Sequence, residues 1–291
     1  MAPVPVPATV PGPRRAVAAA LKWVGLRPQV DPLTGRVTED PHSFGASPAD
    51  QAALELALQL GERWGMPVTA VTAGPPGAAE LLRECLAAGA RRAVRVALPA
   101  GAASAAVADA LAPALAGCTV VCCGDASLDR GTGSVPAFLA DRLDAAQGLG
   151  LVTVEPAAPG VLRGGRRLDG GRRECIVLRE PAVCSVEPHV RRLRRASLAG
   201  VLAARQAAVE VVTPDVDPRG DHDAPRVVRV RPYRPRARAL HSPDPGLTAR
   251  ERVLALTGGP AGATTARVVR SGPREAADEL MDFLHTHGYL P

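Results

Sequence analysis

Aromatic side chains are scarce in this chain of 291 residues, and Phe, Trp and Tyr together make up 2% of it. Lys22 is the sole lysine among 35 basic residues, so arginine carries nearly all of the positive charge. The formal net charge of +6 is compatible with nucleic-acid binding. However, few aromatic residues are interleaved with the basic ones to stack bases. The arginines are spread over many segments, which indicates a solvated basic surface, and we expect no nucleic-acid partner.

Signatures of catalysis and of metal binding are also missing. The chain has no GxSxG and no HExxH sequence. His285 and His287 lack a neighbouring Cys or carboxylate cluster, which favours a surface pair over a metal site. The 6 cysteines form no CxxC pair and fall mainly in apolar runs. This predicts buried, reduced thiols, as in a cytosolic protein.

No long apolar run of the chain predicts a membrane span. The Ala-rich stretch 100–123 is interrupted by Asp109 and Pro113. The apolar run that follows Arg14 and Arg15 is cut short by Lys22, so it predicts no export signal. We therefore expect a cytoplasmic protein.

Apolar runs of strand length alternate with helical patterns from residue 15 onwards. The runs 16–24, 67–74, 92–99 and 119–124 are apolar nearly throughout, which is typical of strands covered on both faces in a parallel sheet. Helices are predicted after the capping residue Ser47, over 78–88, and along the stripe of Val107, Leu111 and Leu115. The alternation predicts an α/β fold with a doubly wound parallel sheet of roughly five strands.

Changes of composition divide the chain into four parts. Residues 1–14 predict a flexible leader and 15–212 the main domain. Inside the main domain, two strands flank Asp169, Gly170 and Gly171, and this hairpin signal predicts a small antiparallel addition. Residues 213–246 are rich in Pro and Arg and predict an extended arm. Residues 247–291 predict a helical extension that closes with a helix after Pro273.

The loop 124–134, after the apolar run 119–124, is the most informative segment. It combines glycines and small hydroxyl residues with the start of a predicted helix, whose unpaired N–H groups and dipole favour an anion. The chain has no GxxxxGK[ST], and no GxGxxG follows the first strand, which excludes a Walker loop and a dinucleotide fingerprint. Because ligands bind beyond the carboxyl ends of parallel strands, we expect a ligand crevice at this loop.

Several ordered blocks of the sequence resemble the beta subunits of electron transfer flavoproteins. They are AALKWV (19–24), DPLTGRV (31–37), SPADQAALELAL (47–58), TAGPP (72–76), CLAAGARRAVRV (85–96) and GDASLDRGTGSVPAFLADRL (124–143). The likeness continues through LDGG (168–171), EPAV (180–183) and RRASLAGVLAARQAAVEV (194–211). The order and the spacing of the blocks also match the family.

The resemblance implies an adenine nucleotide alpha hydrolase-like fold and an electron carrier with no catalytic acid or base of its own. It implies FAD held jointly with an alpha subunit, and transfer of electrons from a client dehydrogenase to a quinone-linked acceptor. It also implies AMP, or a second flavin in bifurcating relatives, in a nucleotide site. The implied site residues are Ala20, Ser47, Pro48, Ala49, Asp50, Ala73, Gly74, Gly124, Asp129, Gly131, Thr132, Gly133 and Ser134.

Three further assignments follow from the resemblance. Arg27 aligns near a position that approaches the flavin ring in relatives. Leu198 matches a leucine that anchors a recognition loop on client dehydrogenases, although a leucine there is also explained by packing in its own domain. The Arg-rich segment 227–240 resembles the extension of beta subunits encoded with the mycofactocin redox system.

Two other functions remain as alternatives. One is a stand-alone adenine-nucleotide-binding protein of the universal-stress or ATP-pyrophosphatase type. The second of these types needs an SGGxDS loop after the first strand, and the chain has KWVGLRP there. The other is a basic module that uses the arm to hold nucleic acid.

Overall fold

The computed structural model describes residues 15–218, 229, 243–257, 269–270, 272–286 and 290. Contacts divide the chain into two compact units, residues 1–233 and 234–291. The predicted leader 1–14, most of the arm 213–246 and His287 lie outside the described residues. The four predicted parts of the chain therefore stay predictions.

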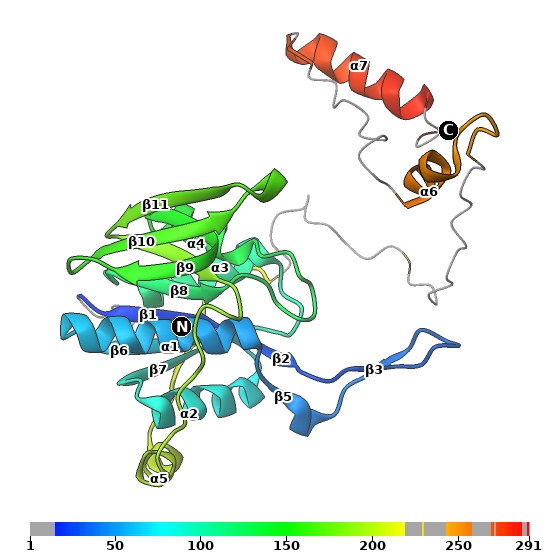
Figure 1. Ribbon diagram of the computed structural model, residues 1–291. Coiled ribbons are helices and arrows are strands. Elements are labelled where there is room, and N and C mark those ends of the chain that lie inside the picture. Colours follow the sequence, from blue (N-terminus) through cyan, green and yellow to red (C-terminus); the bar gives the residue numbers. More distant parts are fainter. Residues whose placement is uncertain are drawn as a thin grey trace, which may run out of the picture. The chain divides into compact units, whose positions relative to one another are not determined.

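A nine-stranded sheet in the order β11-β10-β9-β12-β8-β1-β6-β7-β13 forms the centre of the first unit (Figure 1). The parallel strands are β1 (Val17–Leu21), β6 (Val68–Gly74), β7 (Arg92–Ala97), β8 (Val120–Gly124), β9 (Ala146–Pro156), β12 (Ala182–Val186) and β13 (Glu210–Val212). The hairpin β10 (Val161–Arg167) and β11 (Arg173–Arg179) is antiparallel. The predicted α/β fold with an antiparallel addition is confirmed, and the sheet is larger than predicted.

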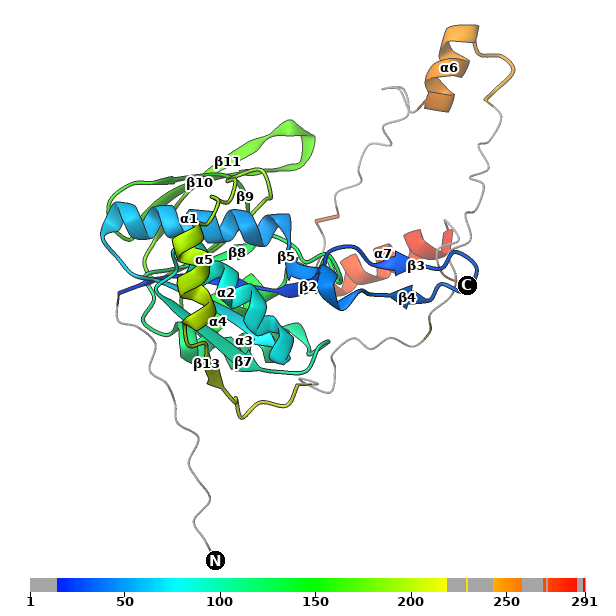
Figure 2. The same ribbon diagram turned by 90° about the horizontal axis from the view of Figure 1, so that it is seen from below.

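Helices cover both faces of the parallel strands (Figure 2). One core holds side chains of α1 (Pro48–Trp64) and α2 (Ala79–Ala88), and the other holds side chains of α3 (Ser104–Leu115) and α4 (Val135–Arg142). Val17 and Ala19 lie in the first core, whereas Ala16 and Ala18 lie in the second. Each strand therefore needs apolar residues at successive positions, which explains the unbroken apolar runs. Every described cysteine is a free thiol, and all but Cys175 are buried.

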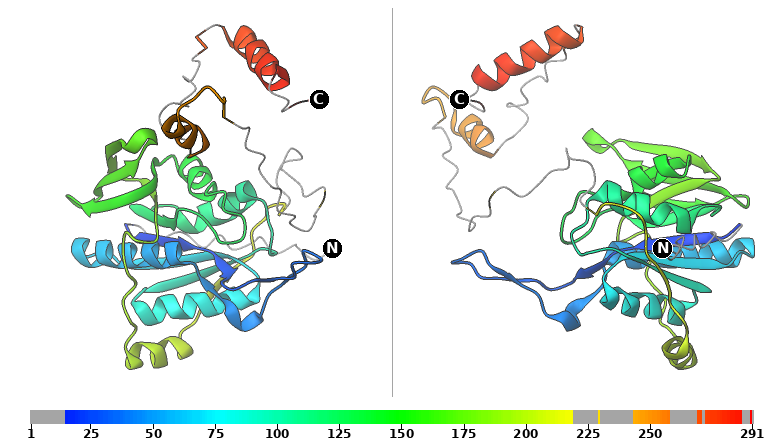
Figure 3. Two further views of the ribbon diagram at one scale, coloured as in Figure 1. Left: turned by 45° about the vertical axis from the view of Figure 1, so that its right-hand side comes forward. Right: turned by 180° about the vertical axis from the view of Figure 1, so that it is seen from behind.

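The apolar run 16–24 is not one strand, which corrects the sequence prediction. β1 ends at Leu21, and Trp23–Gly25 form β2, which pairs antiparallel with β5 (Phe44–Ala46) outside the main sheet. Lys22 interrupts the run because its ammonium group reaches the carboxylate of Asp129. The chain between β2 and β5 forms a hairpin of β3 (Gln29–Val30) and β4 (Val37–Thr38) that extends away from the sheet (Figure 3).

The helix α5 (Leu198–Gln206) packs closely on α2. A Cβ atom at Gly200 would lie 2.7 Å from the carbonyl oxygen of Ala87, so only glycine fits at this contact without a shift. The segment before α5 is fixed to α1 because Arg194 donates to Glu55 at 2.9 Å and also pairs with Glu62. Burial alone would raise the pKa of Glu55, but hydrogen bonds from Arg194 hold it below its ordinary value.

The second unit contains two described helices, α6 (Ala249–Thr257) and α7 (Pro273–Thr286). The predicted closing helix after Pro273 is thus confirmed. Across the described ranges, no helix is long and apolar enough to cross a membrane.

Candidate functional site

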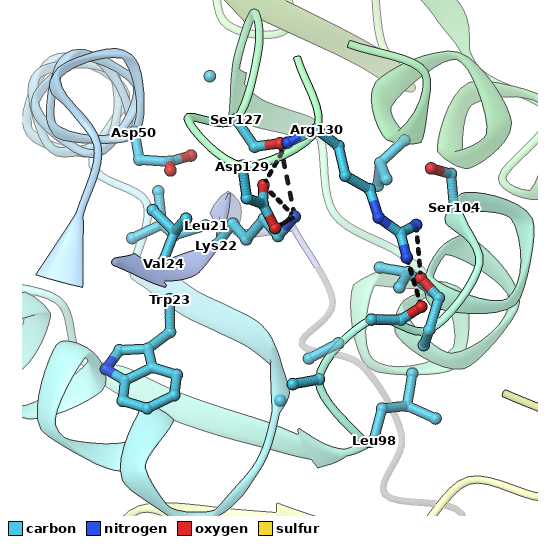
Figure 4. A pocket seen from close by; sticks show the side chains of 18 of the residues that line it. Leu21, Lys22, Trp23, Val24, Asp50, Leu98, Ser104, Ser127, Asp129 and Arg130 are labelled. Carbon is cyan, nitrogen blue, oxygen red and sulfur yellow. Dashed lines mark hydrogen bonds and ion pairs between the residues drawn. The ribbon is translucent and has the colours of Figure 1, made fainter. Parts of the chain in front are cut away.

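A cavity of about 220 Å³ lies at the carboxyl edge of the parallel strands (Figure 4). From β1 the chain adds β6 and β7 on one side, and it then returns to place β8 on the other side of β1. The order of winding therefore reverses between β1 and β8, and such switch points leave a crevice in open α/β sheets. The cavity is lined by the ends of β1, β6 and β8 and by the loops that follow β7 and β8.

The structure brings most of the predicted nucleotide-site residues together around this cavity. Its lining includes Ala20, Asp50, Ala73, Gly74, Gly124, Asp129, Thr132, Gly133 and Ser134. Four predicted residues do not line it: Ser47 and Ala49 are buried behind the wall, and Pro48 and Gly131 are exposed outside it. Arg27 lies exposed just after β2, and Leu198 lies on α5, so neither contributes to the cavity.

Asp50, in the first turn of α1, is only 5% exposed although it carries an ionisable carboxyl group. Its carboxylate accepts hydrogen bonds from the Ser47 hydroxyl at 2.9 Å and from the backbone N–H groups of Ser47, Lys22 and Gly124. The Ser47 hydroxyl in turn accepts from the Asp50 N–H at 3.1 Å, which completes the predicted cap. Burial raises the pKa of Asp50 to about 6, against the opposing effect of these hydrogen bonds.

The approach of α1 to β8 requires a glycine at the end of that strand. A Cβ atom at Gly124 would lie 2.9 Å from an Asp50 carboxylate oxygen and 3.0 Å from the Asp50 backbone nitrogen. Any side chain there would push the start of α1 away from the strand. Gly124 thus allows the backbone of α1 to lie against the end of β8 at the floor of the cavity.

The start of α4 supplies hydrogen-bond donors to the same cavity. Gly131 and Gly133 have φ values of 66° and 60°, and a Cβ atom at Gly133 would lie 2.5 Å from the Asp125 carbonyl oxygen. Among the described residues, no hydrogen bond to a backbone acceptor is made by the N–H groups of Thr132, Gly133 and Ser134. The hydroxyl groups of Thr132 and Ser134 lie 3.1 Å apart. The turn is therefore shaped to offer several donors at one place.

Apolar side chains form the remaining walls. Leu98 comes from the loop after β7, Val107 and Leu111 come from α3, and Ala20 and Ala73 come from β1 and β6. Small and branched side chains of this kind leave a smooth surface for a planar ring. Together with the donors at α4, the cavity has the apolar and polar parts that a nucleotide needs.

Trp23 and Phe44 close one end of the cavity, and sequence reasoning missed both. Their rings stack with centroids 4.2 Å apart and an interplanar angle of 29°. They meet because β2 pairs with β5, and Trp23 also packs over Gly77, where a Cβ atom would lie 3.0 Å from the ring. The scarcity of aromatics in the sequence was the signal that could have drawn attention to this pair.

Lys22, Ser127, Asp129 and Arg130 form a polar group over the cavity, and only Asp129 was predicted (Figure 4). The Lys22 ammonium lies 2.6 Å from the Asp129 carboxylate. Arg130 donates to the carbonyl oxygens of Ala102, at 3.0 Å, and Gly101. Burial alone would raise the pKa of Asp129, but hydrogen bonds from Lys22 and Ser127 hold it below its ordinary value. In the part of the chain that the structure describes, no cluster of His, Cys, Asp and Glu suits a metal ion.

We expect the variant Asp50→Asn to change how stability depends on pH. The folded-state pKa of about 6 lies above the ordinary value of 3.8 for an aspartate, so the folded protein binds this proton more tightly. The resulting stabilisation is complete below pH 3.8 and is lost as the pH rises through 6. The free energy of unfolding of the parent minus that of the variant should thus be larger at about pH 5 than at about pH 7.5, by about 1.4 kcal/mol.

Urea denaturation at the two pH values measures this difference. Asp169→Asn, at an exposed turn, is the matched control and should show no such change. A difference between parent and Asp50→Asn that is the same at both pH values contradicts the assignment.

Comparison with known proteins relates the cavity to a family. The model of the electron transfer flavoprotein domain matches residues 34–217, a range that includes the first turn of α1, the ends of β6 and β7 and the loop before α4. Protein FixA of Bradyrhizobium diazoefficiens is 29% identical over 228 residues, which is 72% of this chain and 78% of that protein. Protein FixA of Sinorhizobium fredii is 31% identical over 220 residues, covering 69% and 76%.

A third relative carries the family's name. The electron transfer flavoprotein subunit beta of Mycobacterium leprae is 34% identical over 176 residues, covering 56% of this chain and 65% of that protein. With a family model over most of the first unit and relatives along the same range, the chain belongs to the electron transfer flavoprotein domain family and is of its beta type.

Proposed function

We propose that this chain is the beta subunit of a heterodimeric electron transfer flavoprotein in the cytoplasm. It passes electrons from a dehydrogenase to a quinone-linked acceptor through FAD held between itself and an alpha subunit. The observation that carries the proposal is the β3–β4 hairpin, which extends from the edge of the sheet that bears the crevice. Its Val30, Leu33 and Val37 are 59%, 86% and 56% exposed. Clustered apolar side chains on an extended hairpin favour contact with a second polypeptide.

The crevice itself fits an adenine nucleotide, and we propose AMP as the ligand. The N–H groups of Thr132, Gly133 and Ser134 are placed to donate to a phosphate, as helix starts commonly do. Ala20 and Ala73 offer a flat apolar wall to the base. The protein groups bind and orient in this proposal, and no proton transfer is required of them.

FAD supplies the one-electron chemistry when it is bound. This chain contributes contact and charge to that site. Arg27 lies exposed just beyond β2, at the base of the hairpin. A partner that binds the hairpin therefore also comes close to the guanidinium group of Arg27. A cation at this position stabilises added negative charge on the neighbouring ring.

Co-expression with an alpha-type subunit from the same genome tests the proposed function. We expect a yellow heterodimer that retains stoichiometric FAD through gel filtration. Leu33→Asp should weaken the heterodimer at least tenfold, because it places a charge in the apolar contact. Leu33 is so exposed that the variant should leave the fold of the isolated chain unchanged. A colourless monomer that hydrolyses ATP would contradict the proposal and favour the stand-alone nucleotide protein.

Arg27→Ala should lower the midpoint potential of the flavin in the heterodimer. Loss of one positive charge near the ring reduces the stabilisation of the reduced state, by an amount on the order of tens of millivolts in a partly solvated site. Redox titration followed by absorbance measures the shift. Arg36→Ala, on the distal part of the same hairpin, is the control. An unmoved potential in Arg27→Ala rules out the assigned role.

We also propose that Leu198 docks on the client dehydrogenase. It is 75% exposed at the first position of α5, which favours docking over packing in its own domain. Leu198→Ala should raise the KM of the dehydrogenase for the flavoprotein about tenfold, as loss of an apolar anchor does. Val211→Ala, 56% exposed on β13, is the control. Equal KM values for parent and Leu198→Ala contradict this role.

The link to the mycofactocin redox system concerns residues 227–240, and the structure describes only residue 229 of that range. It stays a prediction from the sequence.

A further inference from the structure

An ion pair in the cavity lining joins the segments that follow two neighbouring strands, β1 and β8. Lys22 follows β1, and Asp129 lies in the loop after β8. The Lys22 Nζ lies 2.6 Å from each carboxylate oxygen of Asp129 and 3.4 Å from the Ser127 hydroxyl oxygen. Figure 4 shows the two side chains pointing toward one another, with Asp50 to one side and Arg130 to the other.

The carboxylate of Asp129 is held in place by its own loop. It accepts a hydrogen bond from the Arg130 N–H at 2.8 Å. The Arg130 side chain fixes the same loop to the carbonyl oxygens of Gly101 and Ala102. The carboxylate is thus presented to Lys22 by a loop that is anchored on both sides of the cavity.

Two cations, Lys22 and Arg130, are among the described residues that line the cavity, and only Lys22 could turn toward a ligand. The charged residues of the lining are Lys22, Arg130, Glu39, Asp50 and Asp129. Arg130 is committed to two backbone carbonyl groups, whereas Lys22 binds a carboxylate that is 41% exposed. Lys22 itself is also 41% exposed, so its ammonium can rotate between partners at the mouth of the cavity.

A phosphate group at the start of α4 would be the natural alternative partner of Lys22. The N–H groups and hydroxyl groups of Thr132 and Ser134 line the same cavity as the ammonium group. A carboxylate and a phosphate both seek a lysine ammonium through charge-assisted hydrogen bonds. One ammonium group cannot fully neutralise both the carboxylate and the phosphate. The Asp129 carboxylate also repels a phosphate dianion that binds near it.

We propose that Asp129 is an internal competitor for Lys22, and that this competition sets how strongly the crevice prefers a nucleoside phosphate over the nucleoside. The proposal rests on the proposed nucleotide site. With Asp129 ionised, the ammonium charge is already neutralised, so Lys22 adds little to the affinity for a phosphate. With Asp129 neutral, the same ammonium is free to bind phosphate. Asp129 is a specificity residue on this account, and Lys22 is the group through which it acts.

Calorimetry on the flavoprotein heterodimer tests the proposal with adenosine and AMP as ligands. Asp129→Asn should tighten AMP binding about tenfold and leave adenosine unchanged. Lys22→Met should weaken AMP binding and leave adenosine unchanged, and the N–H groups at the start of α4 should supply the preference for AMP that remains. The double variant should gain much less over Lys22→Met than Asp129→Asn gains over the parent, because most of the gain runs through the ammonium group. Asp169→Asn is the matched control and should change neither affinity.

Two results overturn the proposal even if nucleotides bind. One is weaker or unchanged AMP binding in Asp129→Asn. The other is a gain in the double variant as large as in Asp129→Asn alone, which would mean that Asp129 acts by repulsion only.

A second readout keeps the proposal testable if neither adenosine nor AMP binds. Because Lys22 is the sole lysine, an acylating reagent labels it and the chain's α-amino group only, and peptide mapping separates the two. Asp129→Asn should label Lys22 several-fold faster than the parent, and inorganic phosphate should slow labelling in the variant more than in the parent. If these labelling results are obtained and neither adenosine nor AMP binds, the proposed AMP site is contradicted. The competition of Asp129 and phosphate for Lys22 is then still supported. Equal labelling of parent and variant, with or without phosphate, overturns the competition itself.

Discussion

The buried carboxylate of Asp50 is the interaction on which the crevice depends. It accepts hydrogen bonds from N–H groups at the ends of β1 and β8 and from the residue that caps α1. A carboxylate without water is unfavourable unless donors surround it, and here three backbone groups and one hydroxyl do so. The pKa near 6 reflects how nearly these donors offset the loss of hydration. One side chain thereby holds the first turn of α1 against the ends of β1 and β8, the two neighbouring strands between which the winding of the sheet reverses.

The other features of the site depend on this position of α1 beside β1 and β8. Gly124 lets α1 approach the end of β8 closely, so the cavity wall at this point is formed by backbone and not by a side chain. The loop before α4 lines another part of the cavity with Thr132, Gly133 and Ser134. The ion pair of Lys22 and Asp129 then covers the opening. Polar groups surround a cavity whose deeper walls are apolar, an arrangement that is typical of small-molecule sites.

The fold was predictable where local pattern and burial agree. Strands covered on both faces must be apolar throughout, so β6, β7 and β8 could be predicted from the sequence. Ser47 and Asp50 form a capping pattern that predicted the start of α1. The break at Lys22 could not, because a single polar residue in an apolar run has many explanations and its partner lies 107 positions away. The insertion of β12 between β8 and β9 is equally non-local, since pairing order is set by contacts between distant segments. For the same reason the loop after β7 was missed as part of the cavity.

The resemblance in sequence and the geometry bear on different questions. Matching blocks identify the family because their order and spacing are shared, but they do not show which side chains face the ligand. Ser47, Ala49 and Asp129 all lie in such blocks, yet the first two are buried behind the wall and only the third reaches the cavity. Family membership therefore defines the region of the site, whereas the charges within the cavity, where the Lys22 ammonium is paired with the Asp129 carboxylate, are particular to this chain.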